Sequence, residues 1–176
     1  MSTRQILLLG NPRLYESSEE VNEQELESLK SVVADLHDTL MVFRKRWGAG
    51  RAIAAPQVGV MKRLIYMYIE RPFVFINPRL EDQSKEMFEV WDDCMSFPEL
   101  LIKVRRHQSC RIVYRDMSWQ LQSMNLDSDL SELLQHEIDH LDGILSISRA
   151  IDGTAFALRS QAKFTDYDRS GLPEAI

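Results

Sequence analysis

Residues 135–143 read QHEIDHLDG, and this stretch sets two histidines, His136 and His140, on either side of Glu137. Residues four apart lie on one face of an α-helix, so both imidazoles can point at a single metal ion. Glu137 can then reach a water molecule on that ion, as in the His-Glu-x-x-His metalloproteases. The alternative is a polar helix that carries two histidines by chance, and the rest of the sequence has to decide between the two.

The hydrophobic pattern predicts an α+β fold in which this helix comes last. It is expected to begin near residues 127–129, which are good N-cap types, and to end near Gly143. A longer helix is predicted from Glu23, because apolar residues recur every three or four positions as far as Phe43. Between the helices, β-branched and aromatic runs predict strands at 63–69, 73–76, within 80–90, 100–104 and 110–114. The order of helix, strands and helix favours α+β over alternating βαβ units.

The pair of histidines needs a third protein ligand, because a catalytic metal site keeps one position open for water. No histidine follows His140, and the only later glutamate is Glu174, near the end of the chain. Cys94, in the polar stretch DDCMS, is the remaining good candidate, and its thiolate would complete a His₂Cys site. Alone, such a cysteine is more often a packing thiol, which is how we interpret Cys110.

Three segments in this order resemble the peptide deformylases, whose motifs read GxGxAAxQ, EGCxS and QHExDHxxG. The segment GRAIAAPQ at 50–57 matches four fixed positions, DDCMS at 92–96 matches the cysteine and the serine, and QHEIDHLDG matches throughout. The opening LLLGNPRL at 7–14 also resembles the family's first strand and turn. The resemblance covers residues 5 to 150. It implies small mixed or antiparallel sheets packed around a central metal-binding helix, with a catalytic domain at 1–150 and a poorly ordered extension of the same domain at 151–176.

The resemblance also implies the reaction, which is removal of the formyl group from N-formylmethionine at the start of nascent polypeptides. One divalent ion would be held by Cys94, His136 and His140, with ferrous iron named first from the family and zinc or nickel compatible with the ligand types. The ion would make hydroxide available from its water at neutral pH. Glu137 would act as general base and then acid.

Further site residues follow from the same resemblance. The Gln57 side chain and the Met95 backbone N–H would stabilise the oxyanion. The substrate would lie along four residues of the first motif, Gly50, Arg51, Ala52 and Ile53. Independently of the resemblance, Asp139 is expected to support a neighbouring ring or the backbone, and His37, which lies beside the apolar helix stripe, to be structural.

Four positions depart from the family pattern, and three of them, Arg51, Ala52 and Asp93, together predict a changed substrate preference or rate. Ala52 stands for a glycine beside the substrate, Asp92 for a glutamate, and Asp93 for a glycine before the cysteine ligand. Arg51 stands where many relatives carry an aliphatic residue beside the methionine pocket. The shorter Asp92 carboxylate is expected to weaken or move a buried ion pair, and Ala52 to narrow the cleft.

Composition limits the partners. The 176 residues carry a net charge of −6 and a pI near 5.3, which argues against DNA and anionic membranes. The basic stretches at 44–46 and 103–106 are interpreted as solvated positions. Two cysteines, no membrane-length apolar run and no signal-peptide pattern predict a cytoplasmic protein that meets nascent formylated chains, at the ribosome in one version of the hypothesis. The sequence assigns no oligomeric state.

Three alternatives stay open at this stage. The first is a related metal amidase that acts on another N-formyl or N-acyl compound. The second is a catalytically silent deformylase-like protein, against which the retained Glu137 and Gln57 argue. The third is an endoprotease, which the position of the Cys94 ligand disfavours.

Overall fold

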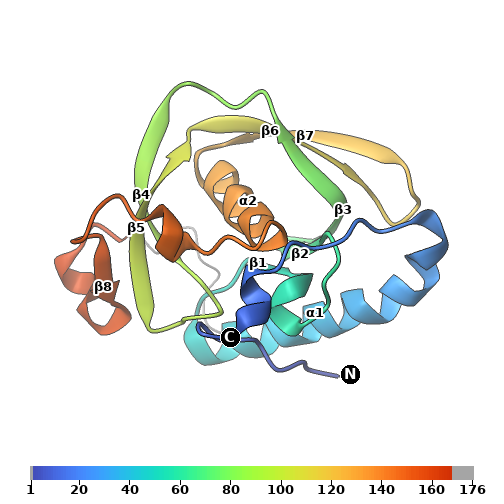
Figure 1. Cartoon of the computed structure of the whole chain (residues 1–176), viewed down its shortest axis with the longest axis horizontal. Helices are drawn as coiled ribbons and strands as arrows, with labels where there is room; N and C mark the ends of the chain where they lie inside the picture. The colour runs from blue at the N-terminus through green and yellow to red at the C-terminus, as the bar shows by residue number, and fades with distance from the viewer. Residues whose placement is uncertain (1, 168–176) are drawn as a thin grey trace.

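The computed structural model describes residues 2–167 and arranges them as two antiparallel sheets around one helix (Figure 1). The five-stranded sheet has the order β1 (Ala52–Ala54), β2 (Leu64–Tyr68), β3 (Pro72–Glu81), β6 (Ser109–Arg115) and β7 (Leu121–Asp127). The three-stranded sheet has the order β4 (Met87–Asp93), β5 (Leu100–His107) and β8 (Phe156–Leu158). The long helices are α1 (Leu26–Trp47) and α2 (Ser128–Leu141), and five short 3-10 helices connect the elements: η1 (Pro12–Tyr15), η2 (Glu23–Glu25), η3 (Ala55–Val58), η4 (Ser146–Arg149) and η5 (Arg159–Phe164).

Helix α2 lies in the middle of the molecule, with strands on several sides of it in Figure 1. Every residue from Ser131 to Leu141 is buried. Its apolar side packs on the five-stranded sheet, where Leu134 and Ile138 share a cluster with Ile65 and Phe75. Its polar side is equally buried, and that side carries both histidines. The predicted α+β fold with antiparallel sheets is therefore confirmed.

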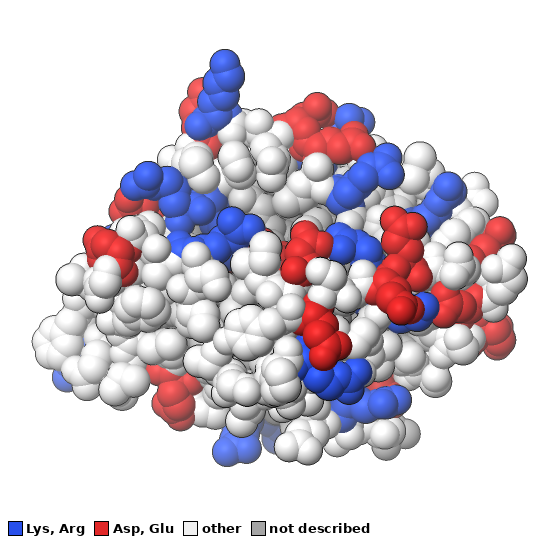
Figure 2. Space-filling view, in the orientation of Figure 1, with Lys and Arg blue, Asp and Glu red and all other residues white. Residues whose placement is uncertain are grey.

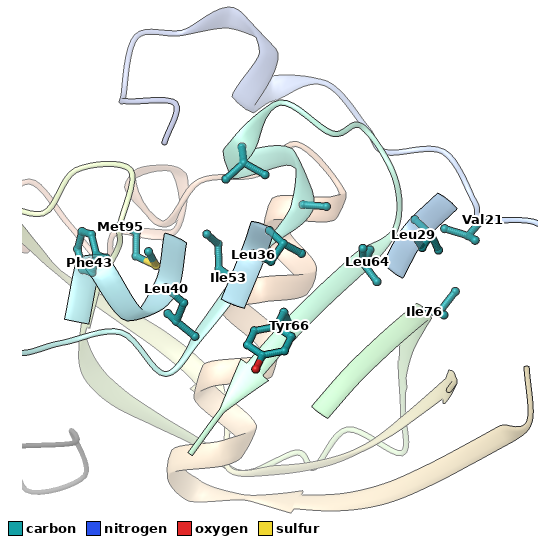
Figure 3. Packing of buried hydrophobic residues seen from close by; sticks show 12 residues of the cluster. Val21, Leu29, Leu36, Leu40, Phe43, Ile53, Leu64, Tyr66, Ile76 and Met95 are labelled. Carbon is teal, nitrogen blue, oxygen red and sulfur yellow. The ribbon is translucent and has the colours of Figure 1, made fainter. Parts of the chain in front are cut away.

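Helix α1 covers the other face of β1 and β2. Leu36 and Leu40 pack against Ile53 and Tyr66, as Figure 3 shows. The helix ends at Gly48, which adopts the left-handed conformation (φ 59°) that glycine takes at a helix C-cap. His37 makes a hydrogen-bonding contact with the Tyr66 hydroxyl (Nδ1–Oη 2.7 Å) on this side of the sheet.

The opening segment connects two of the sequence motifs. The Leu7 N–H donates to the Gln57 carbonyl (2.7 Å), and the Leu9 N–H donates to the Ser96 carbonyl (2.9 Å). The turn after β4 is closed by the Phe97 N–H, which donates to the Cys94 carbonyl (3.1 Å). These bonds fix the η3 segment and the Cys94 turn next to each other.

Three strands were not expected from the pattern, and one of them is β8, three residues long in the C-terminal segment. β1 consists of three small or aliphatic residues, and β7 is an edge strand with few buried side chains, so neither shows a clear apolar alternation. The interpretation of the basic stretches as solvated was wrong for two arginines. Arg44 is buried where its guanidinium donates to the Gly50 and Tyr68 carbonyls, and Arg106 is buried beneath α2.

The chain beyond residue 150 packs on the three-stranded sheet as far as residue 167. β8 pairs with β5, and the Lys103 N–H donates to the Ala155 carbonyl (2.8 Å). Residues 168–176 lie outside the described part, so poor order of the extension stays a prediction. Among residues 2–167, no helix has the length and apolar character that crossing a membrane requires.

Candidate metal centre

The structure brings Cys94, His136 and His140 together in the interior. Their ligand atoms all lie within 4.8 Å of one another, and all three residues are buried. The two histidine Nε2 atoms are 3.1 Å apart, and Cys94 Sγ is 3.2 Å from His140 Nε2. Helix α2 places the histidines one turn apart, and the turn after β4 brings the thiol to them.

Asp92 fixes the orientation of His136. Its carboxylate lies 2.8 Å from His136 Nδ1 and accepts from Arg106 Nη2 (3.0 Å). Burial alone would raise the pKa of Asp92, but the charges of His136 and Arg106 lower it to about 2. With Nδ1 committed to this carboxylate, Nε2 of His136 keeps its lone pair for the cluster. The aspartate therefore reaches both partners despite being one methylene shorter than glutamate, and the expected weakening of the ion pair is not seen.

Asp139 joins the same network from the other side of Arg106. It accepts from Arg106 Nη1 (2.5 Å) and from Arg149 Nε and Nη2 (both 2.6 Å). It supports guanidinium groups rather than a ring or the backbone. The burial of Arg106 could have been predicted from the alternation of β5. Arg106 lies on the same strand face as the buried Ile102 and Val104, four and two residues earlier.

Glu137 lies beside the cluster and is buried, with 3% of the residue exposed. Its Oε2 has no hydrogen-bond partner among the described residues. Burial is the largest influence on its pKa, which is raised to about 7. A buried carboxyl with an unused oxygen next to three convergent ligands is suited to a water molecule on a bound cation. The donor set and this orphaned oxygen fit a catalytic divalent ion.

Gln57 approaches the cluster from η3. Its Oε1 accepts from the Ala54 N–H (2.9 Å), which leaves the amide nitrogen facing Ser96 Oγ (3.3 Å) and Cys94 Sγ (3.7 Å). Met95 follows Cys94 in the buried turn. Both positions therefore lie next to the candidate ligands.

A cleft opens over this region, and most of the predicted substrate residues line it. Gly50, Arg51 and Ala52 face the cleft together with His136 and Glu137. Ile53 has no exposed surface and packs under α1, so its side chain is in the core. β1 is an edge strand of its sheet, so its backbone is paired with β2 on one side only.

One charged residue of the cleft, Glu132, was missed in the sequence, and so was Arg159, which pairs with the cleft residue Asp93. Glu132 lines the cleft one helical turn before His136, and this spacing could have been recognised. Arg51 contacts Asp129 and Glu132. Arg159, from the C-terminal segment, donates to Asp93 (2.7 Å), which occupies the position of the family's glycine.

Two histidines and a cysteine around a buried carboxyl define a metallohydrolase type of centre. Comparison with known proteins places this centre in a family, since the model of polypeptide deformylases matches residues 3–155. The peptide deformylase of Erythrobacter litoralis is 31% identical over 84% of this chain and 89% of its own length. Peptide deformylase 1 of Prochlorococcus marinus is 32% identical over 92% of this chain and 88% of its own. The crystal structure of the peptide deformylase from Thermotoga maritima superposes with a TM-score of 0.80 at 27% identity, covering 86% of this chain and 100% of that one.

The chain therefore belongs to the peptide deformylase family. Members of this family are metal-dependent and remove formyl groups from peptides. The resemblance in the three motifs is confirmed, and so is the expected reaction class.

Proposed function

We propose that this chain hydrolyses the N-formyl group of peptides at the Cys94, His136 and His140 cluster, with Glu137 as general base and then acid. The carrying observation is the buried Glu137 carboxyl, whose Oε2 has no hydrogen-bond partner within residues 2–167 and lies beside three convergent metal-ligand atoms. A structural ion site would need no unpaired carboxyl next to it, because burying one costs free energy.

A divalent ion held by these three residues would supply a water molecule that loses its proton near neutral pH. Ferrous iron is proposed as that ion, and zinc and nickel suit the same donor set. Asp92 supports the site by holding His136 through Nδ1, because a ring held there cannot turn its Nε2 away from the cluster.

Glu137 takes the proton from water as the water oxygen attacks the formyl carbon. It then passes the proton to the departing amine nitrogen. A pKa of about 7 suits both steps, since the carboxyl can accept and release a proton near neutral pH. The products are formate and a peptide with a free amino terminus.

Gln57 and Met95 are proposed to stabilise the oxygen of the formyl group as it gains charge. The Ala54 N–H donates to Oε1 of the Gln57 side chain and fixes the orientation of its amide group. The amide nitrogen therefore already points toward Cys94. The backbone N–H of Met95 would be the second donor. Loss of one such donor costs about 10² to 10³ in rate in other hydrolases.

Formylmethionyl nascent polypeptides are the substrates that the family resemblance implies. Contact with the ribosome and a cytoplasmic location stay predictions. On the face shown in Figure 2, Lys and Arg side chains lie among Asp and Glu in the upper and right-hand parts, and uncharged residues cover most of the lower left. This mixture fits the prediction that DNA is not a partner.

The test is the deformylation rate of formyl-peptides by protein loaded anaerobically with ferrous iron or nickel. Glu137→Gln should abolish turnover while metal content, measured by elemental analysis, stays the same. Glu86→Gln, the same change at an exposed glutamate, is the matched control and should leave the rate unchanged. Absence of turnover in metal-loaded wild-type protein would contradict the proposal.

A further inference from the structure

The wall of the cleft next to the metal centre carries two buried charged side chains. Glu132 lies one turn before His136 on α2, so the two side chains share a helix face, and Arg51 comes from the segment before β1. Both line the same cleft as His136 and Glu137. A substrate group attached next to the formamide would lie against this wall.

Glu132 is nine-tenths buried, yet few of its hydrogen-bonding sites are used. Its side chain is 10% exposed, and its single contact in the described chain is from Arg51 Nη2 at 3.4 Å. The other terminal nitrogen of Arg51 is held closely by Asp129. One oxygen of the Glu132 carboxyl therefore keeps its lone pairs directed at the cleft rather than at a protein donor.

An apolar substrate side chain fits this wall poorly. Full burial of a methionine side chain gains about 1.5–3 kcal/mol. Covering a polar group without replacing its hydrogen bonds with water costs about 1–3 kcal/mol, and more for a charged group. Glu132 and Arg51 would both lose water to a methionine side chain, so the loss offsets the gain.

The charge balance of the cleft favours a donor over an acceptor. The carboxylates of Asp129 and Glu132 both pair with the guanidinium of Arg51. These two contacts occupy both terminal nitrogens of Arg51. Asp93, also on the cleft, is paired with Arg159. The lone pairs that remain are acceptors. Leu133 beside Glu132 gives the apolar part of a longer side chain a surface to contact.

We infer that this cleft selects N-formyl peptides whose first side chain donates hydrogen bonds, and that Glu132 and Arg51 set this preference over methionine. The inference rests on the proposed deformylase chemistry and concerns the first residue only. It names Glu132 as the residue that binds the side chain and Arg51 as the residue that positions the Glu132 carboxyl.

The experiment compares formyl-Gln-Ala-Ala, formyl-Met-Ala-Ala and formyl-Glu-Ala-Ala as substrates of the metal-loaded protein. It is run at pH 9, above the pKa of about 8 to which burial raises the Glu132 carboxyl, so that Glu132 is ionised and can only accept. We expect kcat/KM for the glutamine peptide to exceed the other two by about tenfold, which corresponds to one lost hydrogen bond of about 1.4 kcal/mol. The double variant Arg51→Leu/Glu132→Leu should reverse the order toward methionine. The matched control is Arg105→Leu/Glu89→Leu, which removes a surface pair of the same kind on β5 and β4 and should keep the wild-type order.

Binding to Glu137→Gln protein, measured by calorimetry, separates this inference from the proposed function. Tighter binding of the glutamine peptide without turnover by the wild type would refute the deformylase chemistry and retain the preference. Turnover with methionine preferred, unchanged by the double variant, would overturn the preference and retain the chemistry. Glu132→Gln keeps a hydrogen-bonding side chain of similar size and should retain at least part of the preference for the glutamine peptide. This variant keeps the inference testable if the double variant fails to fold.

Discussion

Replacing Arg106 with leucine tests the ion-pair network beneath the metal helix. The Arg106 side chain is 3% exposed and bridges two carboxylates, Asp92 through Nη2 (3.0 Å) and Asp139 through Nη1 (2.5 Å). Leucine removes the charge and leaves both carboxylates buried. Breaking a buried pair by removing one partner typically costs about 3–5 kcal/mol.

The remaining contacts set where in this range the loss should fall. Asp139 keeps both bonds from Arg149, whose side chain is 42% exposed, and Asp92 keeps His136. We therefore expect the free energy of unfolding to fall by about 3 kcal/mol, at the lower end of the range. Because Asp92 also orients His136, metal affinity should fall by about 10- to 100-fold.

Urea unfolding of the zinc-loaded protein measures the first effect, and competition with a chelator measures the second. Arg105→Leu is the matched control, since Arg105 is the next residue on β5 but is 58% exposed and pairs with Glu89 at the surface. Its loss should cost less than about 1 kcal/mol. Equal, small losses of unfolding free energy and of metal affinity in the two variants would refute the view that the Arg106 network stabilises α2 and orients His136.

Three further predictions concern single positions. Burial raises the pKa of Glu132 to about 8 from its ordinary 4.5, so between these pH values the folded metal-free chain holds a proton that the unfolded chain releases. Its free energy of unfolding should fall by about 1.4 kcal/mol per pH unit from this group as pH rises, and urea titrations of Glu132→Gln should lack that slope. Gly143→Ala should lower the free energy of unfolding by about 1–3 kcal/mol in the same assay, because its φ is +71° and a Cβ would lie 2.6 Å from a backbone carbonyl oxygen. Gly153→Ala is the control and should be nearly neutral, because a Cβ there would meet open space. Cys94→Ala should lower the affinity for zinc in the chelator competition while Cys110→Ala leaves it unchanged, and equal affinities of the two variants would contradict the ligand assignment.

The sequence by itself determined the local elements and the reactive set. A 3.6-residue apolar period and good capping residues predicted α1 and α2, and the spacing of His136 and His140 predicted a shared ligand face. Identification of Cys94 needed agreement among three separate motifs. These features could be predicted because each depends on neighbours within a few residues or on a short fixed motif.

Only the tertiary structure decided what surrounds these residues. Arg106 joins Asp92 to Asp139, and Arg51 meets Glu132, 81 positions away along the chain. A charged residue in a strand or loop shows no period that distinguishes a buried ion pair from a solvated position. Burial and partner are set by how the sheets close around α2, and the polarity of the cleft follows from that packing.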